Sequence, residues 1–276
     1  MLNAFFVVWR ESLEALLIIG ILYAWINAND PGGKGKRALF VGVGVGIVLA
    51  LVLGWALMSA QSGLVGDAQE FFQIAILSVA ALLITQMVLW MSVHGRAMKA
   101  ELENRIETAR RKSGHWGIMI VTALAIAREG SETVVFLSSS SDTFQDVATG
   151  ALGGFAGSLL TAWIAARSLG RLRMGLLLKV SSLLLLVLAS SLLVAASDHI
   201  INLEWLLARV DDQTLAQIMD TIWDSSGFMD DSKGVGSVLA DFAGYRARPI
   251  LPNLLVWGGY WLLVGLAYFF WIRRSK

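Results

Sequence analysis

The sequence predicts an all-α membrane protein of seven transmembrane helices, arranged as an inverted 3+3 repeat followed by a seventh helix, with the N-terminus outside and the C-terminus inside. Three observations lead to this fold class. Seven stretches are long and apolar enough to span a bilayer, the loops between them alternate between basic and non-basic, and one charged motif occurs in both the first and the fourth stretch.

The composition is that of a polytopic membrane protein. Of 276 residues, 56% are hydrophobic and 16% are charged, whereas soluble domains carry about 25% charged residues. The net charge of +1 provides no basic excess for binding nucleic acid. The absence of cysteine excludes disulfides, thiolate metal sites and cysteine nucleophiles. A metal site here would need oxygen or imidazole ligands, and oxygen ligands favour hard ions.

Seven stretches approach the roughly 20 apolar residues that a transmembrane helix needs. Residues 1–93 are predicted to form the first three-helix repeat, 94–115 a basic cytoplasmic loop and 116–197 the second, inverted repeat. An acidic extracytoplasmic loop (198–249) follows, and 250–276 hold the seventh span and a basic tail. The predicted spans are 3–26, 38–60, 71–93, 116–137, 147–166, 180–197 and 250–272.

The loops set the orientation of these spans in the membrane lipid. Segments 27–37, 94–115 and 167–179 carry Lys and Arg, whereas 61–70 and 138–146 carry none. Basic loops remain in the cytoplasm, which places the N-terminus outside. Within the basic loop, the pattern of Glu and Arg four residues apart predicts a solvated helix over 100–112. The outer loop 198–249 holds nine acidic and four basic residues, a balance that could concentrate cations.

Glycines cluster in GVGVG (42–46) and GALGGFAG (150–157). Gly42 with Gly46, and Gly153 with Gly157, have the spacing that lets helices approach closely. Both clusters lie inside predicted spans, so they predict helix packing rather than a nucleotide-binding loop.

The motif R-E-x-x-E occurs as RESLE (10–14) in the first span and as REGSE (128–132) in the fourth. Three spans separate the copies, so the second unit enters the membrane from the opposite side. This is the pattern of an inverted repeat, in which the site lies near the bilayer midplane where the repeats meet. Counted at about 1.5 Å per residue, all four glutamates fall in the central part of the membrane.

Spacing and charge suggest what these residues do. Residues i and i+3 share a helix face, so each Glu pair can converge on one point, while each Arg can pair with the Glu four residues later. Charges at this depth are costly and need partners. Four Glu and two Arg sum to −2, and a bound cation could supply the missing positive charge. The alternative is that the motifs are ion pairs that lock helices together, which two symmetric copies with excess carboxylate make less favourable.

The two motifs resemble the doubled R-E-G-L-E motif of the high-affinity iron permeases, the oxidase-dependent iron transporters, and the resemblance covers nearly the whole chain. QEFFQ (69–73) with TQMVLWM (85–91) is similar to that family's third span. IWDSSGFMDDS (222–232) and GYRARP (244–249) resemble the outer loop and the start of the last span in the bacterial branch. The seven-span, N-outside layout is also similar.

The resemblance implies iron uptake across the bacterial cytoplasmic membrane, with iron as the transported substrate, no permanently bound cofactor and no enzymatic activity. It implies periplasmic partners that bind or oxidise iron, so that ferric iron crosses. It also implies ligand roles for the motif glutamates, and orienting roles for the arginines that keep them ionised. Carried over, the ligands are Glu11, Glu14, Glu129 and Glu132, and the motif arginines are Arg10 and Arg128.

The chain departs from the family pattern at several positions. Ser12 and Ser131 replace the glycine of the first motif and the leucine of the second, and Gln73 stands where many bacterial members have a glutamate. These departures bear on auxiliary sites and on metal selectivity. Three further residues are candidate ligands at the outer mouth of the path, with exposed interfacial side chains as the alternative interpretation: Glu70, Asp198 and His199.

Other functions remain open at this point. A permease for another cation, such as lead or manganese, would use the same carboxylates. A proton-coupled transporter would use intramembrane Glu as a proton carrier. An undecaprenyl-diphosphate-phosphatase-like membrane enzyme also combines inverted repeats with paired Glu segments, but the serine run 138–141 lacks the expected flanking residues and the first span has no serine cluster. The pattern does not choose between rocking of the repeats and a gated channel.

Overall fold

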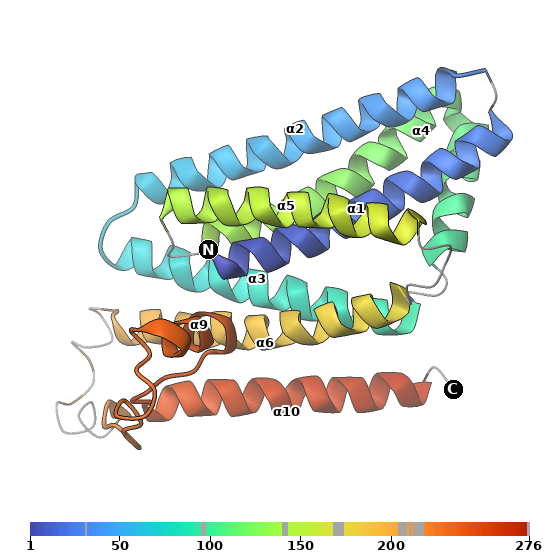
Figure 1. Ribbon diagram of the computed structural model, residues 1–276. Helices are drawn as coiled ribbons and strands as arrows, with labels where there is room; N and C mark the ends of the chain where they lie inside the picture. The colour runs from blue at the N-terminus through green and yellow to red at the C-terminus, as the bar shows by residue number, and fades with distance from the viewer. Residues whose placement is uncertain are drawn as a thin grey trace. The chain divides into compact units, whose positions relative to one another are not determined.

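The structure is a computed structural model, and every helix expected from the apolar stretches is present in the part of the chain it describes (Figure 1). It describes residues 1–30, 32–94, 98–139, 143–167, 174–203, 209, 211 and 218–274. Residues 204–208, 210 and 212–217 of the predicted outer loop therefore lie outside the described residues. The helices are α1 (Leu2–Asn29), α2 (Lys34–Ser62), α3 (Asp67–His94), α4 (Met98–Ser139), α5 (Phe144–Arg167), α6 (Met174–Ile201), α9 (Gly234–Ala243) and α10 (Leu251–Arg274).

The fold class is all-α, as the sequence predicts. Among the described residues there is no strand, and the one β-bridge joins Thr221 to Ile250. Within this part of the chain, five helices are long and apolar enough to cross a membrane, namely α2, α3, α5, α6 and α10. The predicted spans 3–26 and 116–137 lie in α1 and α4, the two helices that carry the charged motifs.

The described chain forms two compact units. One contains Asn3–Ser59 and His94–Met174, and therefore α1, α2, α4 and α5. The other contains Ala60–Val93 and Gly175–Lys276, and therefore α3, α6, α9 and α10. Both copies of the motif belong to the first unit.

Glycines bring α2 against α4 inside the first unit. A Cβ added to Gly42 would lie 2.6 Å from the backbone oxygen of Met119, and one added to Gly46 would lie 2.8 Å from that of Ala123. Both glycines are buried, as is Ala50 one turn further along α2. This close approach confirms the packing role predicted for Gly42 and Gly46.

The second glycine cluster packs α5 against α1, with a shift of register. Added Cβ atoms at Gly150 and Gly154 would collide with the backbone oxygens of Met1 and Phe5. Gly153 and Gly157, the predicted pair, instead meet the aromatic rings of α1 at ordinary to tight contact distance. The closest approach therefore uses the same four-residue spacing three residues earlier, because GALGGFAG offers two such pairs.

Helix α4 is bent at Gly114, whose φ of 59° lies in the left-handed region. The segment of α4 before the bend, residues 98–113, is called the arm below. Ion pairs Glu101–Arg105 at 2.5 Å and Glu107–Arg111 at 2.6 Å lie on its exposed side, as expected for a solvated helix. Its other side differs from that expectation, because Ile106 is fully buried.

The second unit is held by polar contacts between its helices. Thr85 of α3 and Tyr260 of α10 share a hydrogen bond of 3.0 Å between their hydroxyls. The hydroxyl of Ser197 on α6 donates to the Asn253 side-chain oxygen of α10 at 2.9 Å. The hydroxyl of Ser191 donates to the Asp241 carbonyl of α9, also at 2.9 Å.

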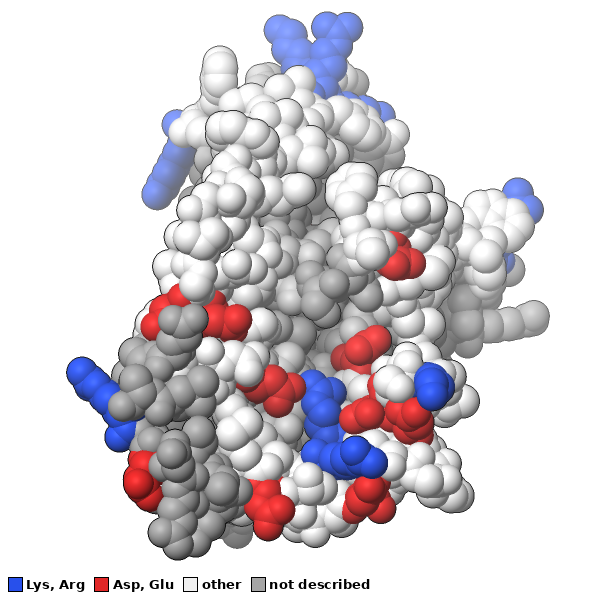
Figure 2. All heavy atoms as spheres, turned by 90° about the vertical axis from the view of Figure 1, so that its left-hand side faces the viewer, with Lys and Arg blue, Asp and Glu red and all other residues white. Residues whose placement is uncertain are grey.

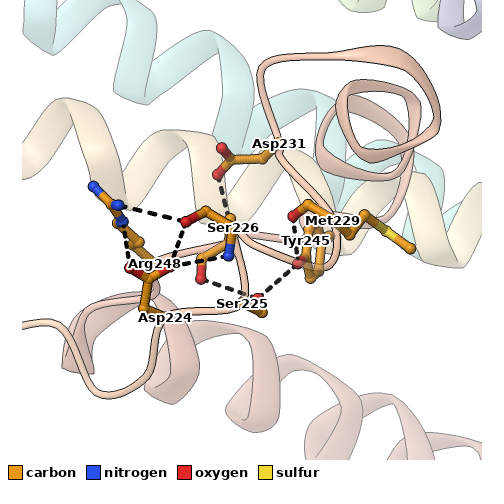
Figure 3. Close-up of polar contacts among 8 residues, drawn as sticks. Asp224, Ser225, Ser226, Met229, Asp231, Tyr245 and Arg248 are labelled. Carbon is orange, nitrogen blue, oxygen red and sulfur yellow. Dashed lines mark hydrogen bonds and ion pairs between the residues drawn. The ribbon is translucent and has the colours of Figure 1, made fainter.

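A hydrogen-bonded loop lies between α6 and α10 in the same unit (Figure 3). The Ser226 hydroxyl and N–H both donate to Asp224, and with Arg248 beside it they hold the pKa of that carboxyl below its usual value. Asp231 accepts the Ala247 N–H at 2.9 Å. Within this loop, residues 224–248 are therefore held in a defined arrangement by hydrogen bonds and an ion pair.

Candidate functional site

Three of the four motif glutamates converge within the first unit. Glu11, Glu14 and Glu129 each offer a carboxylate oxygen, and these oxygens all lie within 4.8 Å of one another. The three residues are 4%, 5% and 6% exposed. This is the arrangement expected when i and i+3 positions of one helix face a motif on a second helix.

The arginine of the first motif lies inside this group. Arg10 Nη1 is 2.9 Å from Glu11 Oε1, and Nη2 is 2.7 Å from Glu14 Oε1. Arg10 itself is 1% exposed. Burying a charge requires a close partner of opposite sign, and here one guanidinium serves two carboxylates. The group of Arg10 with three glutamates, taken with every side chain ionised, still carries a net charge of −2.

The fourth glutamate lies beside the group. Glu132 pairs with Arg128, whose Nε is 3.1 Å from Glu132 Oε1. The Arg128 side chain is 51% exposed and that of Glu132 is 12% exposed. Glu132 remains close enough to interact electrostatically with Glu11 and Glu14. The structure thus brings together three of the predicted ligands and leaves the fourth next to them in an ion pair.

Two carboxylate oxygens in this group have neither a hydrogen bond nor an ion pair among the described residues. Glu11 Oε2 and Glu129 Oε2 are buried and have no partner among the described residues. A buried acceptor without a partner costs free energy of about 1–3 kcal/mol, so such atoms are expected where a ligand supplies the missing interaction. Convergent carboxylate oxygens suit hard cations.

Of the three residues predicted at the outer mouth, two come together. His199 Nδ1 on α6 lies 2.6 Å from Glu70 Oε2 on α3, and both side chains are about one third exposed. Asp198 instead pairs with Arg246, at 2.7 Å. Figure 2 shows acidic and basic side chains gathered on the face that carries this end of α6 and the loop 218–250.

Arg246 is a residue that sequence reasoning did not single out. The sequence gives little indication of its role, because it is one of four basic residues in an acidic loop and lies 48 positions from its partner, Asp198. Pairing with Arg246 occupies Asp198, which leaves Glu70 and His199 as the two adjacent candidate ligands at this end of the second unit.

Comparison with known proteins identifies the family. Residues 1–274 match the sequence model described as the Iron permease FTR1 family. The chain belongs to this family. The resemblance carried by RESLE and REGSE is thereby confirmed. The permease is a transporter rather than an enzyme, which decides against the lipid phosphatase alternative, and iron is its transported substrate rather than a resident cofactor.

Curated relatives of the permease come from enterobacteria. The ferrous iron permease EfeU of Yersinia pestis is 27% identical over 277 residues, covering 98% of this chain and 94% of the relative. The ferrous iron permease EfeU of Escherichia coli O6:H1 is 26% identical over 259 residues, covering 92% and 90%. No solved structure matches the chain. With its apolar helices, the permease is a multi-pass membrane protein.

Proposed function

We propose that the permease carries iron across the inner, cytoplasmic membrane of a bacterium through a carboxylate site built by both copies of R-E-x-x-E. One observation carries this proposal. Glu11, Glu14 and Glu129 are buried with oxygens within 4.8 Å of one another, and oxygens of Glu11 and Glu129 have no partner among the described residues. Glu132 completes the set of ligands as the ion passes, after exchanging Arg128 for the metal.

The arginines hold the glutamates ready for the cation. Arg10 orients Glu11 and Glu14 from inside the group, and Arg128 holds Glu132 at its edge. A neighbouring guanidinium favours the ionised form of a carboxylate. It also lowers the electrostatic cost of keeping three carboxylates together without metal. Iron then supplies the positive charge that two arginines leave missing.

We also propose the inverted repeat and its seven spans. The packing of the first unit supports it, because α2 crosses onto α4 through Gly42 and Gly46, and α5 crosses onto α1 through Gly150 and Gly154. These two contacts are equivalent under an exchange of repeats. The same proposal divides the chain into parts. The two repeats are 1–93 and 116–197, joined by a cytoplasmic loop, 94–115, and they are followed by an outer loop, 198–249, and a last span in 250–276.

Iron would first meet the outer face of the second unit. We propose that Glu70 and His199, 2.6 Å apart, receive the ion there, with Asp198 becoming available when Arg246 releases it. A carboxylate and an imidazole together suit iron. The acidic loop residues raise the local cation concentration.

The oxidation state belongs to the same proposal. Relatives are named ferrous iron permeases. We propose that a periplasmic oxidase partner transfers one electron from each ferrous ion to dioxygen, which is reduced to water, and that ferric iron enters the carboxylate site. Uptake measured with ferrous iron under strict reducing conditions decides this point, since a partner-dependent path would then stop.

The experiment that tests the function is uptake of radiolabelled iron in cells lacking their own iron importers. Glu14→Gln and Glu129→Gln keep the size of the side chain and remove the charge of a ligand. We expect uptake to fall by about 100-fold or more, because changing a residue that only hydrogen-bonds to a metal ligand already costs up to about 100-fold. Glu101→Gln, on the exposed side of the arm, is the matched control.

Membrane expression is measured for each variant. Wild-type uptake in Glu14→Gln and Glu129→Gln would show that the carboxylates are structural. Competition with manganese and lead addresses the alternative cargo, because carboxylates also bind divalent cations such as manganese. Stronger inhibition by manganese than by unlabelled iron would reassign the substrate.

A further inference from the structure

An apolar plug separates the motif glutamates from the end of α1 that is predicted to face the cytoplasm. On α1, positions 18, 22 and 26 follow Glu14 in steps of four residues and so continue its helix face. The side chains there are buried together with residues of α2 and α4. The plug consists of Ile18, Leu22, Ile26, Leu39, Ile106 and Ile118.

The plug extends well beyond the carboxylates. At about 1.5 Å per residue, the twelve positions from Glu14 to Ile26 cover about 18 Å of the α1 axis. An ion cannot cross packed hydrocarbon without a large desolvation cost. Iron leaving the carboxylates along this face of α1 therefore requires the plug to open.

The arm supplies one side of the plug. Ile106 is its fully buried member from the arm, and Leu102 packs against the same cluster. The opposite side of the arm is exposed and carries the pairs with Arg105 and Arg111. Gly114 allows the chain to turn between the arm and the rest of α4. The arm is thus connected to the rest of α4 by a glycine hinge and contributes buried side chains to the plug.

A polar contact fastens the arm to the end of α1. Arg110 Nη1 donates to the Asn29 carbonyl at 2.7 Å, and Nη2 lies 3.4 Å from Asp30 Oδ1. Asp30 is 8% exposed. Its Oδ2 accepts the Gly35 N–H of α2 at 2.9 Å and lies 3.3 Å from His115 Nε2. One carboxylate thus joins α1, α2, the arm and the start of the α4 span.

We propose that the arm is the inner gate of the permease, with Arg110 and Asp30 as its latch. In the docked state Ile106 completes the plug and closes the path below the carboxylates. Release of Arg110 lets the arm swing about Gly114, which withdraws Ile106 and gives iron a way to water. This gate adds a mechanism for iron release to the proposed function. It rests on that function and on the proposed orientation of the chain in the membrane.

Cysteine labelling tests the gate directly, because the natural chain contains no cysteine. Ile106→Cys is introduced, its iron uptake is checked, and inside-out vesicles are treated with a membrane-impermeant maleimide. The docked arm protects this cysteine. Adding Arg110→Ala removes the charged hydrogen bond and the ion pair, so we expect labelling about tenfold faster.

Arg111→Ala is the matched control, since this neighbouring side chain is 79% exposed and pairs with Glu107 within the arm. It should leave labelling unchanged. Arg110→Lys keeps the charge and should label at an intermediate rate, and it replaces Arg110→Ala if that variant fails to insert. Iron supplied to the predicted outer face should speed labelling of the Ile106→Cys protein with its latch intact.

Unchanged labelling in Arg110→Ala and with iron, while uptake proceeds, would overturn the gate and make the arm a fixed part of the bundle. A different result is also possible: Arg110→Ala speeds labelling, but the wild-type protein takes up no iron. That result would contradict the proposed iron transport and not the proposed gate. The labelling step needs no transport, so that result would support the latch.

Discussion

In the first motif, Arg10 is 1% exposed and pairs with Glu11 and Glu14, whereas in the second motif the Arg128 side chain is 51% exposed and pairs with Glu132. The helices that carry them receive equivalent glycine contacts from α2 and α5. The difference therefore lies in the immediate surroundings of the two arginines. The two copies of the motif therefore have different surroundings in this structure. Under the inverted repeat proposed above, the two surroundings would be exchanged when the halves of the transporter exchange roles.

The largest expected effect distinguishes the two glutamates of the second motif. Glu129 lies within the three-carboxylate group and Glu132 lies beside it. We expect Glu129→Gln to lower iron uptake by about 100-fold or more. Glu132→Gln should lower it by about tenfold, which is the smallest loss expected when a residue that supports a metal ligand is changed. Initial uptake rates at matched expression measure this. Equal losses would place Glu132 among the direct ligands in the resting state.

The next effect compares the arginines. Arg10→Met leaves buried carboxylates without their partner, and breaking such a pair costs about 3–5 kcal/mol of folding free energy. Arg128→Met removes a half-exposed partner and should cost about 1 kcal/mol or less. The two variants are heated in detergent, and the fraction of protein that remains monodisperse is measured at each temperature. The midpoint temperatures rank their stabilities. If the Arg128 variant proved as unstable as the Arg10 variant, Arg128 would be buried in the detergent-solubilised protein.

Much of this site is predictable because it depends on local spacing. The repeated R-E-x-x-E predicts that Glu11, Glu14 and Glu129 meet, and hydropathy predicts the helices. Spacing also allows Arg128 to pair with Glu132, but it could not show that Glu129 joins the group while Glu132 stays outside it, because positions 129 and 132 are only about 60° apart on the helix. That choice depends on packing between helices.

Other features depended on contacts that spacing leaves open. GALGGFAG contains two pairs of glycines four residues apart, so the pair that touches α1 is decided by the register of the two helices. Ile106 is a lone isoleucine in a charged helix, and no periodic pattern of apolar residues predicts its burial. Asp198 could pair with several loop cations, and its choice of Arg246 required the folded loop.

A smaller effect concerns the glycine between the glutamates of the second motif. A Cβ on Gly130 would lie 2.6 Å from the Ala50 Cβ of α2. We expect Gly130→Ser to cost about 1–3 kcal/mol, as overpacking does. Thermal unfolding measures it, with Gly44→Ser as the control, because nothing lies within 4 Å of an added Cβ there. Adding Ala50→Gly should recover part of the loss, and no recovery would contradict the contact.

The smallest effect tests the corresponding position of the first motif, where the chain has Ser12 instead of glycine. Ser12→Gly places a more flexible residue in a helix interior and should cost about 0.5 kcal/mol. Because the Arg10 contacts to Glu11 and Glu14 do not involve Ser12, we expect iron uptake and its inhibition by manganese to stay as in the wild type. A changed manganese sensitivity would instead make position 12 a determinant of metal selectivity, and the two motif copies would then differ in chemistry as well as in exposure.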